Sequence, residues 1–94
     1  MRRVHWTDTA IRDIAELKEE LTAIHPEVAK AVLARIAGKV RFLLENPKSA
    51  APTGHRDWRH RIVSKTSRVI VYRPDRDGIL VLRVLHAHSD RRKP

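Results

Sequence analysis

The sequence predicts a two-layer α+β domain, in which a helical hairpin packs on a small antiparallel sheet in the order β-α-α-β-β-β. Apolar residues recur every three or four positions between residues 8 and 45, which predicts helices, and three apolar segments between residues 58 and 86 predict strands. The dipeptide Asp77-Gly78 is typical of a tight hairpin turn, because glycine adopts a positive φ without steric cost. We expect residues 1–94 to form one domain, with residues 89–94 as a mobile basic tail.

The first half of the chain predicts one short strand and two helices. Residues 3–6 alternate in polarity, and the pair Thr7-Asp8 supplies an N-cap for the helix that follows. Pro26 should end this helix near His25 and begin the next one, which continues to Asn46-Pro47. The short linker predicts that the two helices lie antiparallel. Their apolar stripes consist of Ile11, Ile14, Leu17, Leu21 and Ile24, and of Val28, Val32, Leu33, Ile36, Val40, Leu43 and Leu44.

The second half predicts a loop over residues 47–57 and strands over residues 58–63, 68–73 and 79–86. Side chains alternate across a strand, so Arg59 and Arg61 should share one face of the first of these strands. In the last strand, an undistorted alternation places Arg83 with Ile79, Val81 and Leu85, and places His86 on the opposite face. One face of the sheet must pack on the helices, and we expect the arginines on the face that remains free.

The positive charge is concentrated in the second half. The net charge is +9, and residues 1–54 carry nine Lys/Arg against seven Asp/Glu, whereas residues 55–94 carry eleven against four. Such a field attracts a polyanion, either nucleic acid or an acidic protein, although a solvated basic surface would give the same count. The absence of cysteine excludes disulfides and thiolate chemistry. No apolar run approaches a membrane span and the N-terminus is not a secretory signal, so we expect a soluble cytoplasmic protein without membrane association.

A basic patch with one aromatic residue is the main candidate site. Arg68 and Tyr72 lie on one face of the second sheet strand, and together with Arg59 and Arg61 they could bind phosphate or stack on a base. The other interpretation of Tyr72 is a core residue whose hydroxyl reaches the surface. Arg83 interrupts an apolar strand, which is costly unless the guanidinium faces a groove or pairs with an acid such as Asp57 or Asp90.

His86 and His88 end the last strand. Two histidines spaced by two residues could chelate a metal, but they do not make a site without further ligands, and we expect none. His86 could act as a general acid or base because its ordinary pKa is near neutrality. The sequence contains no P-loop, nucleophile elbow, HExxH or paired-carboxylate motif, and we expect no cofactor.

The chain resembles the RelE/ParE superfamily, the toxins of type II toxin–antitoxin modules. The resemblance is carried by the helical hairpin, Asn46-Pro47, and the strand sequences Arg59-His60-Arg61-Ile62-Val63, Arg68-Val69-Ile70-Val71-Tyr72-Arg73 and Ile79-Leu80-Val81-Leu82-Arg83-Val84-Leu85-His86, together with the opening Val4-His5-Trp6-Thr7. It covers nearly the whole chain, and it implies the α+β fold described above.

The superfamily implies two activities. ParE-like members poison DNA gyrase, and the ending of this chain is similar to theirs: an arginine, two apolar residues, a histidine and then an acid, here Arg83 to Asp90. RelE-like members cleave mRNA on the ribosome, and Arg61, Arg68, Arg83 and His86 would be the matching catalytic residues. Fold analogy alone does not choose between them, but the ending favours the ParE type. The resemblance therefore implies either a gyrase inhibitor that is not an enzyme or, for a RelE-like toxin, an endoribonuclease.

The resemblance also implies a partner. An antitoxin would form a hetero-oligomer with the toxin, through an acidic C-terminal segment that folds as it binds. The residues expected to bind this antitoxin or the target are Arg59, Arg61, Arg68, Tyr72, Arg83, His86 and His88. The target would be DNA gyrase, or the ribosome and its mRNA for a RelE-like toxin.

Overall fold

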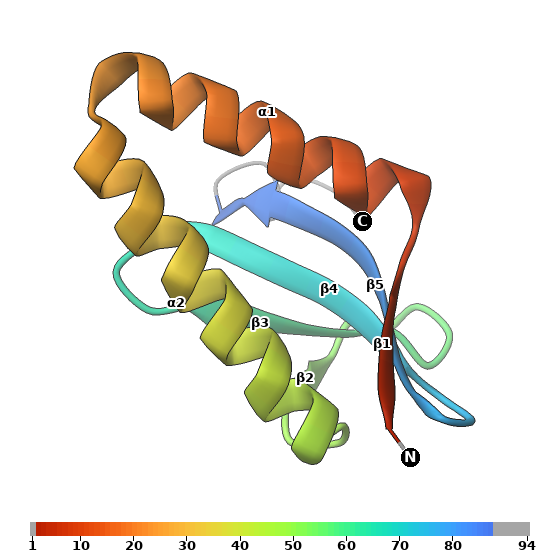
Figure 1. Cartoon of the computed structure of the whole chain (residues 1–94). Coiled ribbons are helices and arrows are strands. Elements are labelled where there is room, and N and C mark those ends of the chain that lie inside the picture. Colours follow the sequence, from red (N-terminus) through yellow and green to blue (C-terminus); the bar gives the residue numbers. More distant parts are fainter. Residues whose placement is uncertain (1, 88–94) are drawn as a thin grey trace.

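The computed structural model describes residues 2–87, which form two helices and a five-stranded sheet (Figure 1). The elements in chain order are β1 (Arg3–Trp6), α1 (Asp8–Ile24), α2 (Pro26–Glu45), β2 (Ala51–Pro52), β3 (Arg59–Val63), β4 (Arg68–Asp75) and β5 (Gly78–His86). The strands lie in the order β1-β5-β4-β3-β2, and the α1–α2 hairpin packs over one face of the sheet. The predicted α+β class is confirmed.

The sheet differs from the prediction in two respects. The first strand, β1, lies at one edge and runs parallel to β5, so the sheet is mixed rather than antiparallel throughout. The predicted loop contains the short strand β2, which pairs antiparallel with β3. A strand of two residues is too short to produce a visible alternation, which explains why the sequence did not predict it. The segment 89–94, expected to be a mobile tail, lies outside the described residues.

The helix ends follow from local chemistry. Thr7 is the N-cap of α1, and its Oγ1 accepts a hydrogen bond from the Ala10 N–H at 3.0 Å. His25 is the whole linker, and Pro26 stands in the first turn of α2, where its missing N–H costs nothing. Asn46 ends α2, and its side chain donates to the Phe42 carbonyl at 3.0 Å.

The core lies between the hairpin and the sheet. Apolar side chains of both helices and of β3, β4 and β5 fill it, among them Leu17, Ile36, Val40, Leu43, Val63, Ile70, Tyr72, Ile79, Val81 and Val84. Not all of the predicted stripe residues contribute, because Ile11, Ile24 and Val28 are exposed. No helix within residues 2–87 combines the length and the apolar character needed to cross a bilayer.

A bulge in β5 changes the predicted alternation. Tyr72 pairs with Val81, whereas the preceding Val71 pairs with Arg83, so β5 has one extra residue, Leu82, at this point. Ile79 and Val81 face the helices, but Arg83 lies on the opposite face, and the prediction that it shares their face is wrong. The bulge precedes Arg83, so His86 and Arg83 still lie on opposite faces, as the alternation predicted.

The residue that caps α1 hydrogen-bonds to β5 just beyond the end of β1. The last residue of β1, Trp6, is paired with Val81. The Thr7 N–H then donates to the Val81 carbonyl at 3.1 Å, and Thr7 Oγ1 donates to the Leu82 carbonyl at 2.9 Å. The start of α1 thus takes the place of a further strand at the bulge and satisfies backbone groups that would otherwise form an open edge.

Candidate functional site

The predicted basic patch lies on the helix-facing side of the sheet. Arg59 is paired with Tyr72, Arg61 with Ile70, and Arg68 with His86, across adjacent strands. Tyr72 and Ile70 belong to the core beneath the helices, so all of these side chains are on that same face. The structure therefore brings the predicted residues together, but the prediction that they occupy the free face is wrong. Strand alternation predicts which side chains share a face, but not which face the helices cover.

Arg59 and Tyr72 hold the segment that follows α2. Arg59 Nη1 donates to the carbonyls of Ala50 at 2.7 Å and Lys48 at 3.3 Å, and the Tyr72 hydroxyl donates to the Pro47 carbonyl at 2.7 Å. Tyr72 is fully buried. It is the core residue anticipated as one interpretation, but its hydroxyl ends on a backbone carbonyl inside the protein rather than at the surface.

The burial of Tyr72 predicts a measurable dependence of stability on pH. Burial raises the pKa of the Tyr72 phenol above its ordinary value of 10.0, although the nearby positive charge of Arg59 opposes this. The neutral phenol is favoured in the fold, so its stabilisation is complete below pH 10 and is lost as pH rises toward the folded pKa. Because Tyr72 is the single tyrosine of the chain, tyrosinate absorbance reports on it directly. We expect the native protein to titrate at higher pH than the urea-unfolded protein.

The Tyr72→Phe substitution is the control for this titration. It removes the hydroxyl hydrogen bond at a cost of about 1 kcal/mol and should abolish this part of the alkaline loss of stability. Identical titration curves for the native and unfolded protein would contradict the expectation.

Among the described residues, Arg61 and Arg68 lack the backbone-carbonyl hydrogen bonds that hold Arg59. Arg61 Cζ lies 5.5 Å from the ring centroid of Phe42 on α2, and Lys39 Nζ lies 5.1 Å from the same centroid. Arg68 starts β4, and its side chain is only 16 % exposed. Its Nη2 lies 3.7 Å from the Glu20 carboxylate of α1, which is a long ion pair.

Arg83 forms a clamp with Asp13 of α1. Arg83 Nε and Nη2 donate to the two carboxylate oxygens of Asp13 at 2.9 and 3.1 Å, and the Val84 N–H donates to Asp13 Oδ2 at 2.9 Å. The hydrogen bonds from Arg83 to Asp13 raise the pKa of the guanidinium above its ordinary value. Of the two interpretations of Arg83, the one in which it pairs with an acid is confirmed, but the partner is Asp13 rather than Asp57, and Asp90 lies outside the described residues. No pattern in the sequence pointed to Asp13, which lies off the apolar stripe like any solvated acid.

The structure does not bring the four predicted nuclease residues together. Arg61, Arg68 and His86 share the helix-facing side of the sheet. Arg83 lies on the other face, where its guanidinium is hydrogen-bonded to the Asp13 carboxylate. His88, predicted to bind an antitoxin or target, lies outside the described residues.

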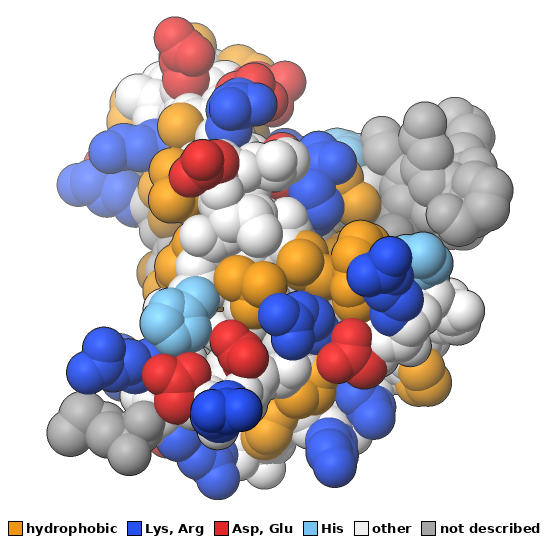
Figure 2. Space-filling view, turned by 90° about the vertical axis from the view of Figure 1, so that its right-hand side faces the viewer, with side chains coloured by type: hydrophobic (Ala, Val, Ile, Leu, Met, Phe, Trp, Pro, Cys, Tyr) orange, Lys and Arg blue, Asp and Glu red, His pale blue; other side chains and the backbone are white. Residues whose placement is uncertain are grey.

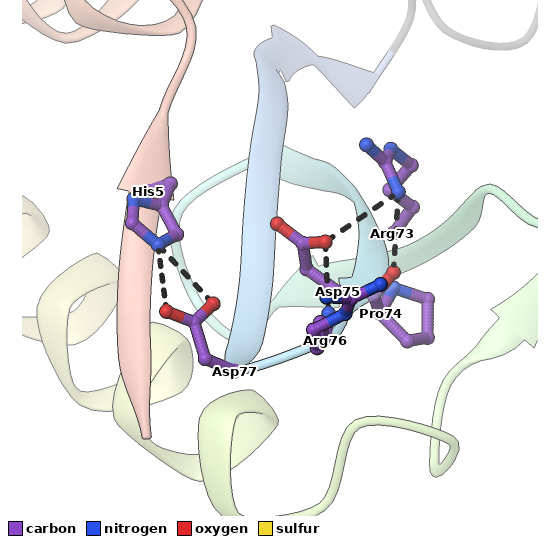
Figure 3. A network of polar contacts seen from close by, with 6 residues as sticks. All are labelled: His5, Arg73, Pro74, Asp75, Arg76 and Asp77. Carbon is purple, nitrogen blue, oxygen red and sulfur yellow. Dashed lines mark hydrogen bonds and ion pairs between the residues drawn. The ribbon is translucent and has the colours of Figure 1, made fainter. Parts of the chain in front are cut away.

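A second polar cluster lies where β1 meets the β4–β5 turn (Figure 3). His5 Nε2 lies 3.3 Å from Asp77 Oδ1, and an oxygen of Asp75 also lies within 4.8 Å of these ligand atoms. Asp75 accepts from the Arg76 N–H at 2.8 Å and lies 3.9 Å from Arg73 Nη1. All three groups are exposed and both carboxylates have cationic or N–H partners, so we assign the cluster a role in holding β1 to the turn.

Comparison with known proteins places the chain in a family. The family model described as the ParE toxin of the type II toxin–antitoxin system parDE matches residues 4–91. A relative from Sinorhizobium fredii, named "Putative toxin Y4kP", is 33 % identical over 88 residues, which cover 94 % of this chain and 91 % of the relative. In a structure of the chromosomal ParDE system from P. aeruginosa, one chain has a similar fold, with a TM-score of 0.79 at 20 % identity over 92 % of this chain and 96 % of that one. The chain thus belongs to the ParE toxin family of type II toxin–antitoxin systems.

Proposed function

We propose that this toxin inhibits growth by poisoning DNA gyrase and that a cognate antitoxin neutralises it in a hetero-oligomer. The observation that carries the proposal is the match of residues 4–91 to the ParE family. The position of Arg83 supports it, because the bulge in β5 places Arg83 on the face opposite Arg61, Arg68 and His86, and its guanidinium is paired with Asp13. The separation disfavours a cooperating set of catalytic groups, which requires side chains within reach of one reacting atom.

Among the residues predicted to contact the antitoxin or the target, Arg61 and Arg68 are best placed. Both lie on the helix-facing side of the sheet, and within residues 2–87 neither side chain donates to a backbone carbonyl as Arg59 does. Among these residues, the acid within ion-pair distance of either is Glu20, 3.7 Å from Arg68 Nη2. Arg59 and Tyr72 are engaged with backbone carbonyls of the segment after α2. We therefore assign those two to holding that segment in place, and Arg61 and Arg68 to partner binding.

The test of gyrase poisoning uses toxin released from its complex with the antitoxin. Added to gyrase and plasmid DNA, the toxin should reduce supercoiling and cause cleaved, gyrase-linked DNA to accumulate, and prior addition of the antitoxin should prevent both effects. Unchanged supercoiling together with unchanged cleavage would overturn the proposal.

A ribosome-dependent endonuclease is the second candidate, because Arg61, Arg68 and His86 do share one face. The same toxin preparation in a translating extract distinguishes the two functions. Gyrase poisoning predicts intact mRNA in that extract, whereas cleavage of ribosome-bound mRNA with normal gyrase activity would establish the RelE-like function. Substituting Arg61 or Arg68 by alanine should then abolish the mRNA cleavage.

A further inference from the structure

The polar cluster where β1 meets the β4–β5 turn combines one imidazole with two carboxylates (Figure 3). His5 lies on β1, and 72 positions along the chain separate it from Asp77 at the turn. One donor atom each of His5, Asp75 and Asp77 lies within 4.8 Å of the other two. Mixed nitrogen and oxygen donors of this kind bind Zn²⁺, whereas Ca²⁺ and Mg²⁺ prefer oxygen ligands alone.

The contacts that hold β1 to the turn leave donor atoms of this cluster unused. Asp75 accepts from the Arg76 N–H and faces Arg73 through the same oxygen, Oδ1. Within residues 2–87, its other oxygen, Oδ2, accepts no hydrogen bond. His5 Nε2 lies 3.3 and 3.4 Å from the two oxygens of Asp77, which is longer than a usual N–H···O hydrogen bond. Each of the three residues can therefore offer a donor atom to a metal ion without breaking a short hydrogen bond.

The distance between His5 and Asp77 fits the coordination sphere of zinc. A tetrahedral Zn²⁺ ion with bonds of about 2.0–2.1 Å holds its ligand atoms about 3.3 Å apart. His5 Nε2 and Asp77 Oδ1 are separated by 3.3 Å. Asp75 is exposed, so its side chain is free to rotate toward the same point and supply a third ligand. Water completes the tetrahedron.

The backbone fixes where the donors of the two strands meet. The Arg3 N–H donates to the Asp77 carbonyl at 2.7 Å, and Arg3 is paired with Gly78 in the parallel ladder. His5 follows two residues later, on the same face of β1 as Arg3. A hollow of about 340 Å³ lies beside the turn and is lined by both carboxylates, so ions and water have access to them.

We propose that His5, Asp75 and Asp77 form a zinc site that ties β1 to the β4–β5 turn. The ion replaces the long contact between His5 and Asp77 by two metal–ligand bonds, and it adds a bond to Asp75. The inference goes beyond the proposed function and does not depend on it, because it concerns the attachment of β1 and not the target of the toxin.

The charges around the site set its affinity. Two carboxylates balance the charge of a divalent ion. The side of the molecule that carries β1 and the β4–β5 turn has Lys/Arg side chains interspersed with Asp/Glu (Figure 2), and Arg73 Nη1 lies 3.9 Å from Asp75 Oδ1. These cations repel a metal ion. We therefore expect a dissociation constant on the order of 10 μM, well above that of sites with four protein ligands.

The test titrates Zn²⁺ into the purified toxin by calorimetry in a buffer that does not bind zinc. One ion should bind per chain. His5→Gln removes the nitrogen ligand and should weaken binding by about 30-fold, and Asp77→Asn should weaken it by about 10-fold because it keeps the shape but loses the charge. His25→Gln removes another exposed histidine, in the linker between the helices, and should stay within about twofold.

Hydrogen exchange distinguishes this site from zinc bound at other histidines. Saturating Zn²⁺ should slow exchange of the β1 amides and leave those of α2 unchanged, because the ion closes β1 onto the turn. Asp75→Asn keeps the oxygen that accepts from the Arg76 N–H, so it supplies a ligand-deficient variant if Asp77→Asn impairs folding. In that variant, zinc should no longer slow exchange in β1.

Three results would overturn the zinc site. The first is a dissociation constant of the unmodified toxin above about 1 mM. The second is equal zinc affinity of His5→Gln and His25→Gln. The third is loss of binding in His86→Gln/His88→Gln with His5 intact, which would assign the zinc to the end of β5 instead.

Discussion

Substituting Asp13 by alanine is expected to lower the free energy of unfolding by about 2–4 kcal/mol. The Asp13 side chain is only 11 % exposed and accepts three hydrogen bonds, two from Arg83 and one from the Val84 N–H. Alanine leaves that N–H without an acceptor beside the bulge and leaves the guanidinium without its counter-charge. The Arg83 side chain is 44 % exposed, so water compensates part of the loss, and the expected cost is below that of a fully buried ion pair.

Urea unfolding monitored by circular dichroism measures this effect. For a domain of this size, the loss corresponds to a decrease in Tm of roughly 10–20 °C. Asp13→Asn retains an oxygen that can accept from the Val84 N–H but loses the charge opposite Arg83, so about half of the effect is expected. Glu19→Ala, at an exposed position of the same helix, is the control and should stay within about 0.5 kcal/mol. Equal stabilities of Asp13→Ala and Glu19→Ala would show that the clamp contributes nothing.

Substituting Gly78 by alanine is expected to cost about 2–4 kcal/mol and to loosen β1. A Cβ at Gly78 would lie 1.8 Å from the Arg3 carbonyl oxygen and less than 3 Å from the Arg3 N and C atoms, which are all backbone. The first residues of β1 would have to move away from β5. That movement breaks the 2.7 Å hydrogen bond from the Arg3 N–H to the Asp77 carbonyl and separates His5 from Asp77.

Hydrogen exchange locates this effect. The amides of β1 should exchange much faster in Gly78→Ala, whereas those of α2 should change little. Gly38→Ala is the matched control, since the same added methyl group meets no atom within 4 Å and improves helix propensity. It should stabilise the protein by about 0.5–1 kcal/mol. Unchanged β1 exchange in Gly78→Ala would contradict the close approach of the two strands.

The element boundaries were predictable because they depend on neighbouring residues. The Thr7 cap, the proline at the start of α2 and the stop at Asn46 act within one helical turn, and the helices begin and end at those residues. The predicted strands agree with β1, β3, β4 and β5 to within two residues at each end. The parallel pairing of β1 was not predictable, because it joins Arg3 to Gly78 across most of the chain.

The composition of the candidate site and the face that its strand residues share were predictable, but its position relative to the helices was not. The sequence placed the basic residues in the second half and predicted that Arg59, Arg61, Arg68 and Tyr72 share a face, which the strand register confirms. The choice of face was wrong, and Lys39 and Phe42 were not expected near Arg61. The distance of Lys39 and Phe42 from Arg61 depends on the angle at which α2 crosses the sheet, and this angle cannot be predicted from a local sequence pattern.

Local spacing and residue counts were enough to predict the α+β class, the helix ends and the basic second half, and the strand sequences carried the resemblance to ParE toxins. Three features became visible only in the folded protein: Arg83 lies off the basic face, Asp13 binds it, and Arg61 contacts Phe42. Arg83 lies away from the basic face because one extra residue in β5 reverses the alternation beyond it, whereas the contacts of Asp13 with Arg83 and of Phe42 with Arg61 depend on how the helices pack on the sheet. Whether a strand contains such a bulge depends on its partners, here Tyr72 on β4 and Thr7 at the start of α1.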